Sequence, residues 1–344
     1  MDASRISVSR RARILFPLAL LCSASPVVAQ SDAEYFRDKT IRVIIPSAPG
    51  GGRVLNTMPL VQFYGRHLPG KPQVQPVFMP GAGGSQAMNY TYGVAPRDGT
   101  TITTPLVDVP SAQAIGEAAV KYDVSKMAWI GRTTDATRVL FVRGDASASS
   151  LDDLRKRELI IGSAGRSTQT YSNPAIMNKY LGTRFKIVVG YKSAVDVNDA
   201  VDKRETDAAT TSWANLNSLH PDWLREGRMR VLFQIGLMRS PELANVPLLS
   251  ELASDDEGRA VINFMSAASD IGEAFLAPPG VPARIIEMMR RGFDETMKDP
   301  EYQATVQKLG IVLNPLTGEE MTRISDSIVG APKHVIEHYM AAME

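Results

Sequence analysis

Short runs of β-branched and apolar residues alternate along the chain with amphipathic segments. The runs are rich in valine and isoleucine, which is typical of strands buried on both faces. They predict strands at 41–46, 74–79, 139–142, 159–163, 186–189 and 231–235. Because strands and helices take turns along the chain, the pattern predicts an α/β fold.

Four amphipathic segments carry helix signals. The first strand is followed by apolar residues at helical spacing, from Val54 to Leu68. Ser150 precedes an acidic first turn, and Pro282 opens a segment with an apolar stripe. A further helix is predicted to start at Asp299-Pro300 and to stop at Gly310, with an inward face made by the following residues: Tyr302, Val306 and Leu309.

Glycine-rich segments follow three of the predicted strands, at 46–52, 80–85 and 162–168. In open α/β sheets, ligands bind beyond the carboxyl ends of the strands. Helix N-termini at those ends present unpaired N–H groups and the positive end of the helix dipole, which favour anions. The three loops therefore predict an anion-binding cleft. The alternative is that the glycines only make tight turns between strands and helices.

Composition excludes several functional classes. The chain has 344 residues, of which 44% are apolar and 22% charged, and its formal net charge is +1. Such a balance lacks the basic footprint of a nucleic-acid-binding protein. Four histidines and one cysteine exclude a zinc site of the Cys₄ or Cys₂His₂ type and any intrachain disulfide. We expect no cofactor and no metal.

The N-terminus has the pattern of a secretory signal peptide. Four arginines precede a short apolar run, and Val27 and Ala29 occupy the small-residue positions of a cleavage site. We expect residues 1–29 to be removed, which changes the formal net charge from +1 to −2, and we expect the mature protein in the periplasm. Two weaker alternatives are a lipoprotein anchored at Cys22 and twin-arginine export through Arg10 and Arg11. No later apolar run approaches the length of a membrane span, so we expect the mature protein not to be membrane-embedded.

Several motifs resemble those of one family. The chain has Pro-Gly-Gly-Gly at 49–52, Pro-Gly-Ala-Gly-Gly at 80–84, Pro-Arg-Asp-Gly at 96–99 and Ala-Pro-Pro-Gly-Val-Pro at 277–282. At this spacing the chain resembles the solute-binding proteins of the tripartite tricarboxylate transporter system, the Bug family. The resemblance covers essentially all of the mature chain.

The resemblance implies a two-lobed periplasmic binding protein fold, similar to type II, with two α/β lobes joined by crossing strands and a ligand cleft between them. We expect lobe 1 to comprise residues 30–142 and 236–344 and lobe 2 to comprise residues 143–235. The crossings are then expected near Val142 and Ile235. The implied partners are a small organic acid and the membrane subunits of a tripartite transporter. We expect a monomer.

The resemblance also implies that backbone N–H groups and hydroxyls of two opposed loops hold a ligand carboxylate. Carried over to this chain, the residues expected from lobe 1 are Ala48, Pro49, Gly50, Gly51, Gly52, Arg53, Gly83 and Gly84. Those expected from lobe 2 are Gly165, Arg166, Ser167, Thr168, Tyr191, Thr211 and Ser212.

One departure from the family pattern bears on the ligand. The first loop of the family often ends in an aspartate, and this chain has Arg53 and Val54 there. A guanidinium offers a fork of donors that matches a carboxylate. If Arg53 and Arg166 both face the cleft, they predict a more anionic ligand, such as a dicarboxylate. If either side chain points to solvent, that prediction loses its basis.

Other motifs permit alternative functions. His334-Val-Ile-Glu-His338 matches an inverted zinc-peptidase pattern, but only six residues follow it, and we interpret it as a surface helix. The segment 165–169 lacks the final glycine of a nucleophile elbow, so a hydrolase using Ser167 is a minor alternative. A third possibility is a sensory protein whose ligand-bound form docks on a receptor. For Trp213 and Trp223, packing is favoured over stacking on a ligand.

Overall fold

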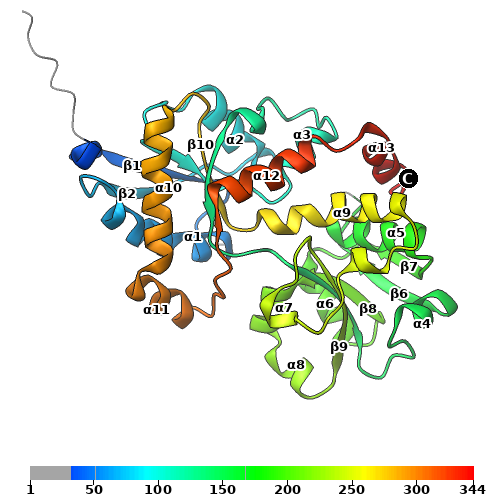
Figure 1. Cartoon of the computed structure of the whole chain (residues 1–344). Helices are drawn as coiled ribbons and strands as arrows, with labels where there is room; N and C mark the ends of the chain where they lie inside the picture. The colour runs from blue at the N-terminus through cyan, green and yellow to red at the C-terminus, as the bar shows by residue number, and fades with distance from the viewer. Residues whose placement is uncertain (1–31, 51, 167) are drawn as a thin grey trace, which may run out of the picture.

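The protein, described by a computed structural model over residues 32–50, 52–166 and 168–344, is built on two mixed β-sheets with helices around them (Figure 1). The first sheet has the order β11-β4-β10-β3-β1-β2, and the second has the order β7-β6-β8-β5-β9. We call the parts built on these sheets lobe 1 and lobe 2. The two-lobed α/β fold expected from the sequence is confirmed.

The strands of the first sheet are β1 (Thr40–Ile45), β2 (Gln73–Phe78), β3 (Thr101–Thr103), β4 (Ala128–Arg132), β10 (Ala274–Ala277) and β11 (Leu316–Thr317). Those of the second are β5 (Arg138–Arg143), β6 (Glu158–Ser163), β7 (Arg184–Val189), β8 (Ala208–Ser212) and β9 (Met229–Ile235). Strand β1 pairs in parallel with β2 and β3, and β6 pairs in parallel with β7 and β8. Parallel pairing brings the loops after these strands to one edge of each sheet.

The helices of lobe 1 include α1 (Gly52–Phe63), α2 (Ser85–Gly93), α3 (Val109–Ala114), α10 (Ala283–Lys298), α11 (Pro300–Lys308) and α12 (Gly318–Val329). Those of lobe 2 are α4 (Leu151–Lys156), α5 (Gln169–Leu181), α6 (Ala194–Asp202), α7 (Trp213–Leu219) and α8 (Pro221–Arg225). Two more, α9 (Asp256–Ile271) and α13 (Lys333–Ala341), lie where the lobes meet (Figure 1).

The six strands predicted from the apolar runs are all present, within two residues of their predicted ends. The predicted helix signals are also confirmed: the Ser150 hydroxyl accepts from the Asp153 amide, and Asp299 caps α11. One detail was wrong. Leu309 is 54% exposed, whereas Tyr302 and Val306 are buried. The reason is that α11 ends at Lys308, so Leu309 no longer lies on its inward face.

The first crossing between lobes comes earlier than expected. Strand β5 pairs with β8 and β9, so residues 138–142 belong to the second sheet and not to lobe 1. The crossing is therefore the segment 133–137, between β4 and β5, and not the region near Val142. Hydropathy could not locate it because β4 and β5 are both buried strands.

We expected the C-terminal helix in lobe 1, but in the structure it also contacts lobe 2. Helix α13 packs against α9, and the Tyr180 hydroxyl of α5 donates to the carbonyl of His338 at 3.3 Å. One core cluster runs through both lobes around α9, with Trp129 and Met321 on one side and Ile161 and Ile176 on the other. The lobes are therefore joined by a packed apolar region as well as by the chain crossings.

Candidate functional site

A cavity of about 600 Å³ lies between the lobes. Lobe 1 contributes Arg53 and Asn56 of α1, and lobe 2 contributes the end of β8 and the first turns of α7. The remaining walls come from the crossing 134–137, from residues 240–242, from Glu273 and from the segment after α11. We call this cavity the cleft.

Arg53 lines the cleft, but its guanidinium is already bound within lobe 1. Its Nη1 donates to Oε2 of Glu273 at 2.9 Å, to the carbonyl of Pro105 at 2.9 Å and to the Thr104 hydroxyl at 3.1 Å. Both side chains of the ion pair are nearly buried, at 13% and 12% exposure. Burial raises the pKa of Glu273, and the Arg53 charge partly opposes that rise. The charge of Arg53 is therefore balanced before any ligand binds.

Two further carboxylates face the cleft. Asp135 accepts from the amide nitrogen of the Asn314 side chain at 2.6 Å and from the Thr137 amide at 3.1 Å. Glu242 accepts from the indole N–H of Trp213 at 3.0 Å, which links the start of α7 to the segment 240–242. We call the part of the cleft lined by the crossing 134–137, residues 240–242 and Glu273 the hinge side. Asp135, Glu242 and Glu273 outnumber the guanidinium of Arg53 there, which does not suit a second ligand carboxylate.

The loop between β6 and α5 is organised by its own hydroxyls. Thr168 donates to the carbonyl of Gly165 at 2.7 Å and lies 2.6 Å from the Thr170 hydroxyl, which accepts from the Ala164 amide at 3.0 Å. The Arg166 side chain is exposed and donates to the Tyr171 hydroxyl at 3.1 Å. Ser167 lies outside the described residues. The hydroxyl of Thr168 thus shapes the loop, and Arg166 is open to solvent.

The loop residues expected from lobe 1 differ in their surroundings. Ala48, Pro49 and Gly50 are exposed after β1, and Gly51 lies outside the described residues. Gly84 is buried with φ +85°, and a Cβ there would lie 2.7 Å from Leu106. Glycine at this position is explained by packing alone, whereas Gly83 is exposed with nothing near it.

Two residues expected from lobe 2 have packing roles. The Thr211 side chain is buried, and its hydroxyl accepts from the Asn198 side chain at 3.0 Å. The Tyr191 ring packs over Gly162, where a Cβ would lie 3.0 Å from it. Ser212, in contrast, lies at the end of β8 and lines the cleft.

Sequence reasoning missed most of the hinge side of the cleft. Trp213, for which packing was favoured, lines the cleft as well as packing in lobe 2. Leu55, Leu309 and Val312 are exposed apolar residues of the same cavity. Their exposure follows from positions at helix ends and crossings, which no periodic pattern in the sequence reveals.

The C-terminal histidines, His334 and His338, both lie on α13. The rings of His334 and His338 are 6.1 Å apart, and His338 pairs with Glu257 of α9 at 3.0 Å. Within residues 32–50, 52–166 and 168–344, no group of three or more His, Cys, Asp or Glu side chains could hold a metal ion. In the same part of the chain, no helix has both the length and the apolar character of a membrane span.

A family model described as "Tripartite tricarboxylate transporter family receptor" matches residues 71–339. The chain belongs to this family. The match covers the second sheet, every strand of the first sheet except β1, and most residues that line the cleft, so the family resemblance is confirmed. No curated protein sequence matches the chain.

Several solved structures share the fold of this chain. A TctC solute-binding protein from Polaromonas, without ligand, aligns with a TM-score of 0.71 at 16% identity, covering 88% of this chain and 97% of that one. Rpa4515 of R. palustris, solved with adipate, aligns at 0.61 and 15% identity, covering 88% and 97%. MatC from Rhodopseudomonas palustris, solved with malate, aligns at 0.56 and 18% identity, covering 89% and 99%.

Proposed function

We propose that the protein is a periplasmic solute-binding protein that captures a small organic carboxylate and delivers it to a tripartite tricarboxylate-type membrane transporter. The observation that carries the proposal is the cleft between two lobes in a member of this receptor family. The structural neighbours solved with malate and adipate support a carboxylate as the ligand class. Export through the signal peptide at 1–29 and a monomeric state are parts of the same proposal.

The surroundings of Arg53 change the ligand proposed from the sequence. A guanidinium that already pairs with a buried carboxylate adds no net charge for a ligand. We therefore propose one carboxylate held firmly at lobe 2, where the β6–α5 loop and the start of α5 lie. The hinge side of the cleft, lined by Asn56, Trp213 and Asn314, then takes the uncharged or hydrogen-bond-donating part of the ligand.

A thermal-shift and calorimetry screen tests this function. Mature protein, residues 30–344, is titrated with monocarboxylates, with malate, with adipate and with the neutral amides of these acids, and the solutions are analysed for products. A ligand at 100 times its dissociation constant stabilises the folded state by about 2.7 kcal/mol. The proposal expects saturable stabilisation by at least one acid with the acid recovered unchanged. Conversion of the acid, or tighter binding of neutral compounds than of any acid, contradicts it.

A further inference from the structure

Arg138 lies at the edge of the second sheet that faces the cleft. It is the first residue of β5, where it is the register partner of Ser212 on β8 and of Ile235 on β9. Its neighbour Thr137 and its partner Ser212 both line the cleft. The backbone of Arg138 is therefore at the boundary between the cleft and the interior of lobe 2.

Strand alternation gives the face on which its side chain lies. Val139 and Phe141 pack in a cluster with Val197 of α6, whereas Leu140 and Val142 pack in the cluster that contains Ile176 of α5. Arg138 is two residues before Leu140 in the strand, so both side chains lie on the same face of the sheet, the one covered by α5. There its Nη2 donates to the carbonyl of Thr210 at 3.3 Å.

This guanidinium lacks a counter-charge among the described residues. It forms no ion pair there, and its Nε is enclosed without a hydrogen-bond partner. Arg53, by contrast, pairs with Glu273, and Arg132 lies near Asp270. Burial lowers the pKa of Arg138 to about 10, so the group remains charged at neutral pH. The Arg138 side chain as a whole is partly buried, and a partly buried charge without a partner still costs stability, which calls for an explanation.

A second donor on the same face also lacks an acceptor. The Thr210 hydroxyl is buried with no partner. In the parallel pairing of β6 with β8, Ile161 lies opposite Ala208. Ser163 and Thr210 each lie two residues further along their strands, so the β6–α5 loop begins next to Thr210. Helix α5 starts there, and Thr168 at its N-cap makes no side-chain capping bond. The helix therefore adds the positive end of its dipole to the charge of Arg138.

We propose that Arg138 is the group in lobe 2 that binds the carboxylate of the ligand, together with the Thr210 hydroxyl and the start of α5. The inference rests on the proposed function and adds a residue that the family motifs did not indicate. An entering carboxylate supplies both the missing charge and acceptors for the unpaired donors. Arg138 thus lowers the stability of the ligand-free protein and raises its affinity for the ligand.

The test compares Arg138→Met, Arg138→Lys and Arg230→Gln with the wild-type mature protein. Methionine keeps most of the side-chain volume without the charge, and lysine keeps the charge without the fork of donors. Arg230 is an exposed residue of β9 that pairs with Val142, away from the cleft, and serves as the matched control. Melting temperature is measured without added acid and with malate, adipate, the monocarboxylates of the screen and inorganic phosphate.

We expect Arg138→Met to melt at or above the wild-type temperature without acid and to bind the stabilising acid at least about tenfold more weakly. Arg138→Lys retains part of the affinity, and Arg230→Gln retains all of it. An unchanged affinity in Arg138→Met overturns the inference while leaving the proposed function intact. If no acid stabilises the wild type, the proposed function fails. The inference then stands only if Arg138→Met raises the melting temperature and loses the response to phosphate, and it fails otherwise.

Discussion

Nη1 of Arg53 lies 2.9 Å from Oε2 of Glu273, which follows it by 220 residues in the chain. The pair joins the start of α1 to the residue just before β10, at the lobe 1 wall of the cleft. The resemblance led us to expect an aspartate at this position, and the chain instead has an arginine whose charge is balanced by a carboxylate from elsewhere in the chain. The substitution therefore changes the wall of the cleft without making it cationic.

We predict that Arg53→Ala destabilises the protein most strongly at neutral pH. The substitution leaves the Glu273 carboxylate buried without its partner, and breaking such a pair costs about 3–5 kcal/mol. Burial already raises the pKa of Glu273, and losing Arg53 raises it further. A carboxyl with a raised pKa in the folded state binds its proton more tightly there than in the unfolded chain. The loss of stability is therefore smaller near pH 4 and grows as the pH rises.

Urea denaturation of Arg53→Ala at several pH values measures this effect. Arg53→Ala combined with Glu273→Gln is the control, because the neutral amide needs no counter-charge. We expect the double variant to recover much of the stability and to lose the added pH dependence. If both variants are equally destabilised at every pH, the ion pair is not the cause.

We predict a second pH dependence of the stability, caused by Asp270 near the end of α9. Its carboxylate accepts from the Leu237 amide at 2.6 Å and lies 3.9 Å from Nη1 of the fully buried Arg132. Burial raises the pKa of Asp270 to about 6, against the opposing effects of the Leu237 amide and Arg132. Between about pH 4 and pH 6, the Asp270 carboxyl is therefore mostly protonated in the folded state and mostly ionised in the unfolded state. This group lowers the free energy of unfolding as the pH rises through that window.

Asp270→Asn isolates this contribution. The amide oxygen can still accept from Leu237, but the side chain no longer titrates. We expect the stability of the wild type relative to Asp270→Asn to fall between pH 4 and pH 6, by about 1.4 kcal/mol for each pH unit at most. Parallel stability curves for the two proteins over this range contradict the assignment.

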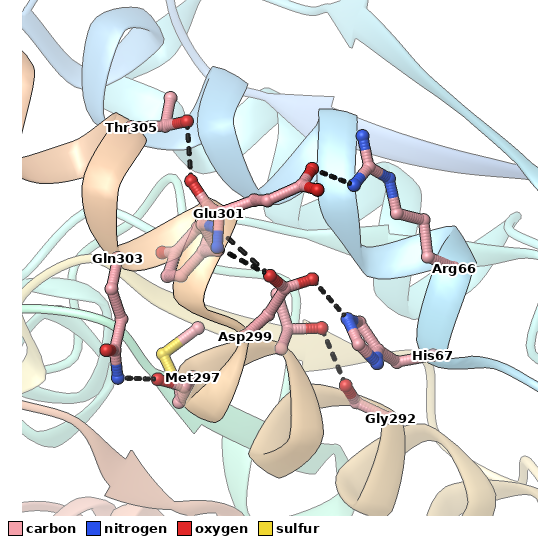
Figure 2. A network of polar contacts seen from close by, with 10 residues as sticks. Arg66, His67, Gly292, Met297, Asp299, Glu301, Gln303 and Thr305 are labelled. Carbon is pink, nitrogen blue, oxygen red and sulfur yellow. Dashed lines mark hydrogen bonds and ion pairs between the residues drawn. The ribbon is translucent and has the colours of Figure 1, made fainter.

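Asp299 is predicted to stabilise the start of α11 in two separable ways. Figure 2 shows its carboxylate between the His67 ring, at 2.8 Å, and the first turn of the helix. It accepts from the Glu301 amide at 2.8 Å and from the Tyr302 amide at 3.4 Å. The hydrogen bond from His67 is the main cause that lowers the pKa of Asp299, and burial opposes it.

Asp299→Ala removes the cap and costs about 0.5–2 kcal/mol, whereas Asp299→Asn keeps a capping oxygen and loses the charge. We expect the alanine variant to be the less stable of the two at pH 7. A lowered pKa contributes stability above the pKa of an unfolded aspartate, and this contribution is lost as the pH falls through the folded value. The difference between wild type and Asp299→Asn should therefore disappear in acid. A difference that persists there argues against the charged contact with His67.

The sequence predicted the long strands and the capped helices because these depend on local signals. It did not predict β3, β4, β8, β10 and β11. Three of them, β3, β8 and β10, are short segments rich in threonine or alanine that become strands through their neighbours in the sheet. The same limit applies to the site. Glycine loops were visible as motifs, but the pairing of Arg53 with Glu273 and the isolation of Arg138 depend on distant parts of the chain.

Closure of the lobes on the ligand is the last prediction. The cleft has walls from both lobes and from the crossing 134–137, and periplasmic binding proteins close by hinge motion around such segments. The packed region around α9 and α13 lies outside the set of residues that line the cleft, so closure can proceed while that region stays packed. We expect small-angle scattering to show a smaller radius of gyration when the stabilising acid saturates the wild type. Arg138→Met at the same acid concentration is the control, and its radius of gyration should decrease only in proportion to the bound fraction that calorimetry gives for this variant. An unchanged wild-type profile at saturation, established by calorimetry on the same sample, contradicts closure.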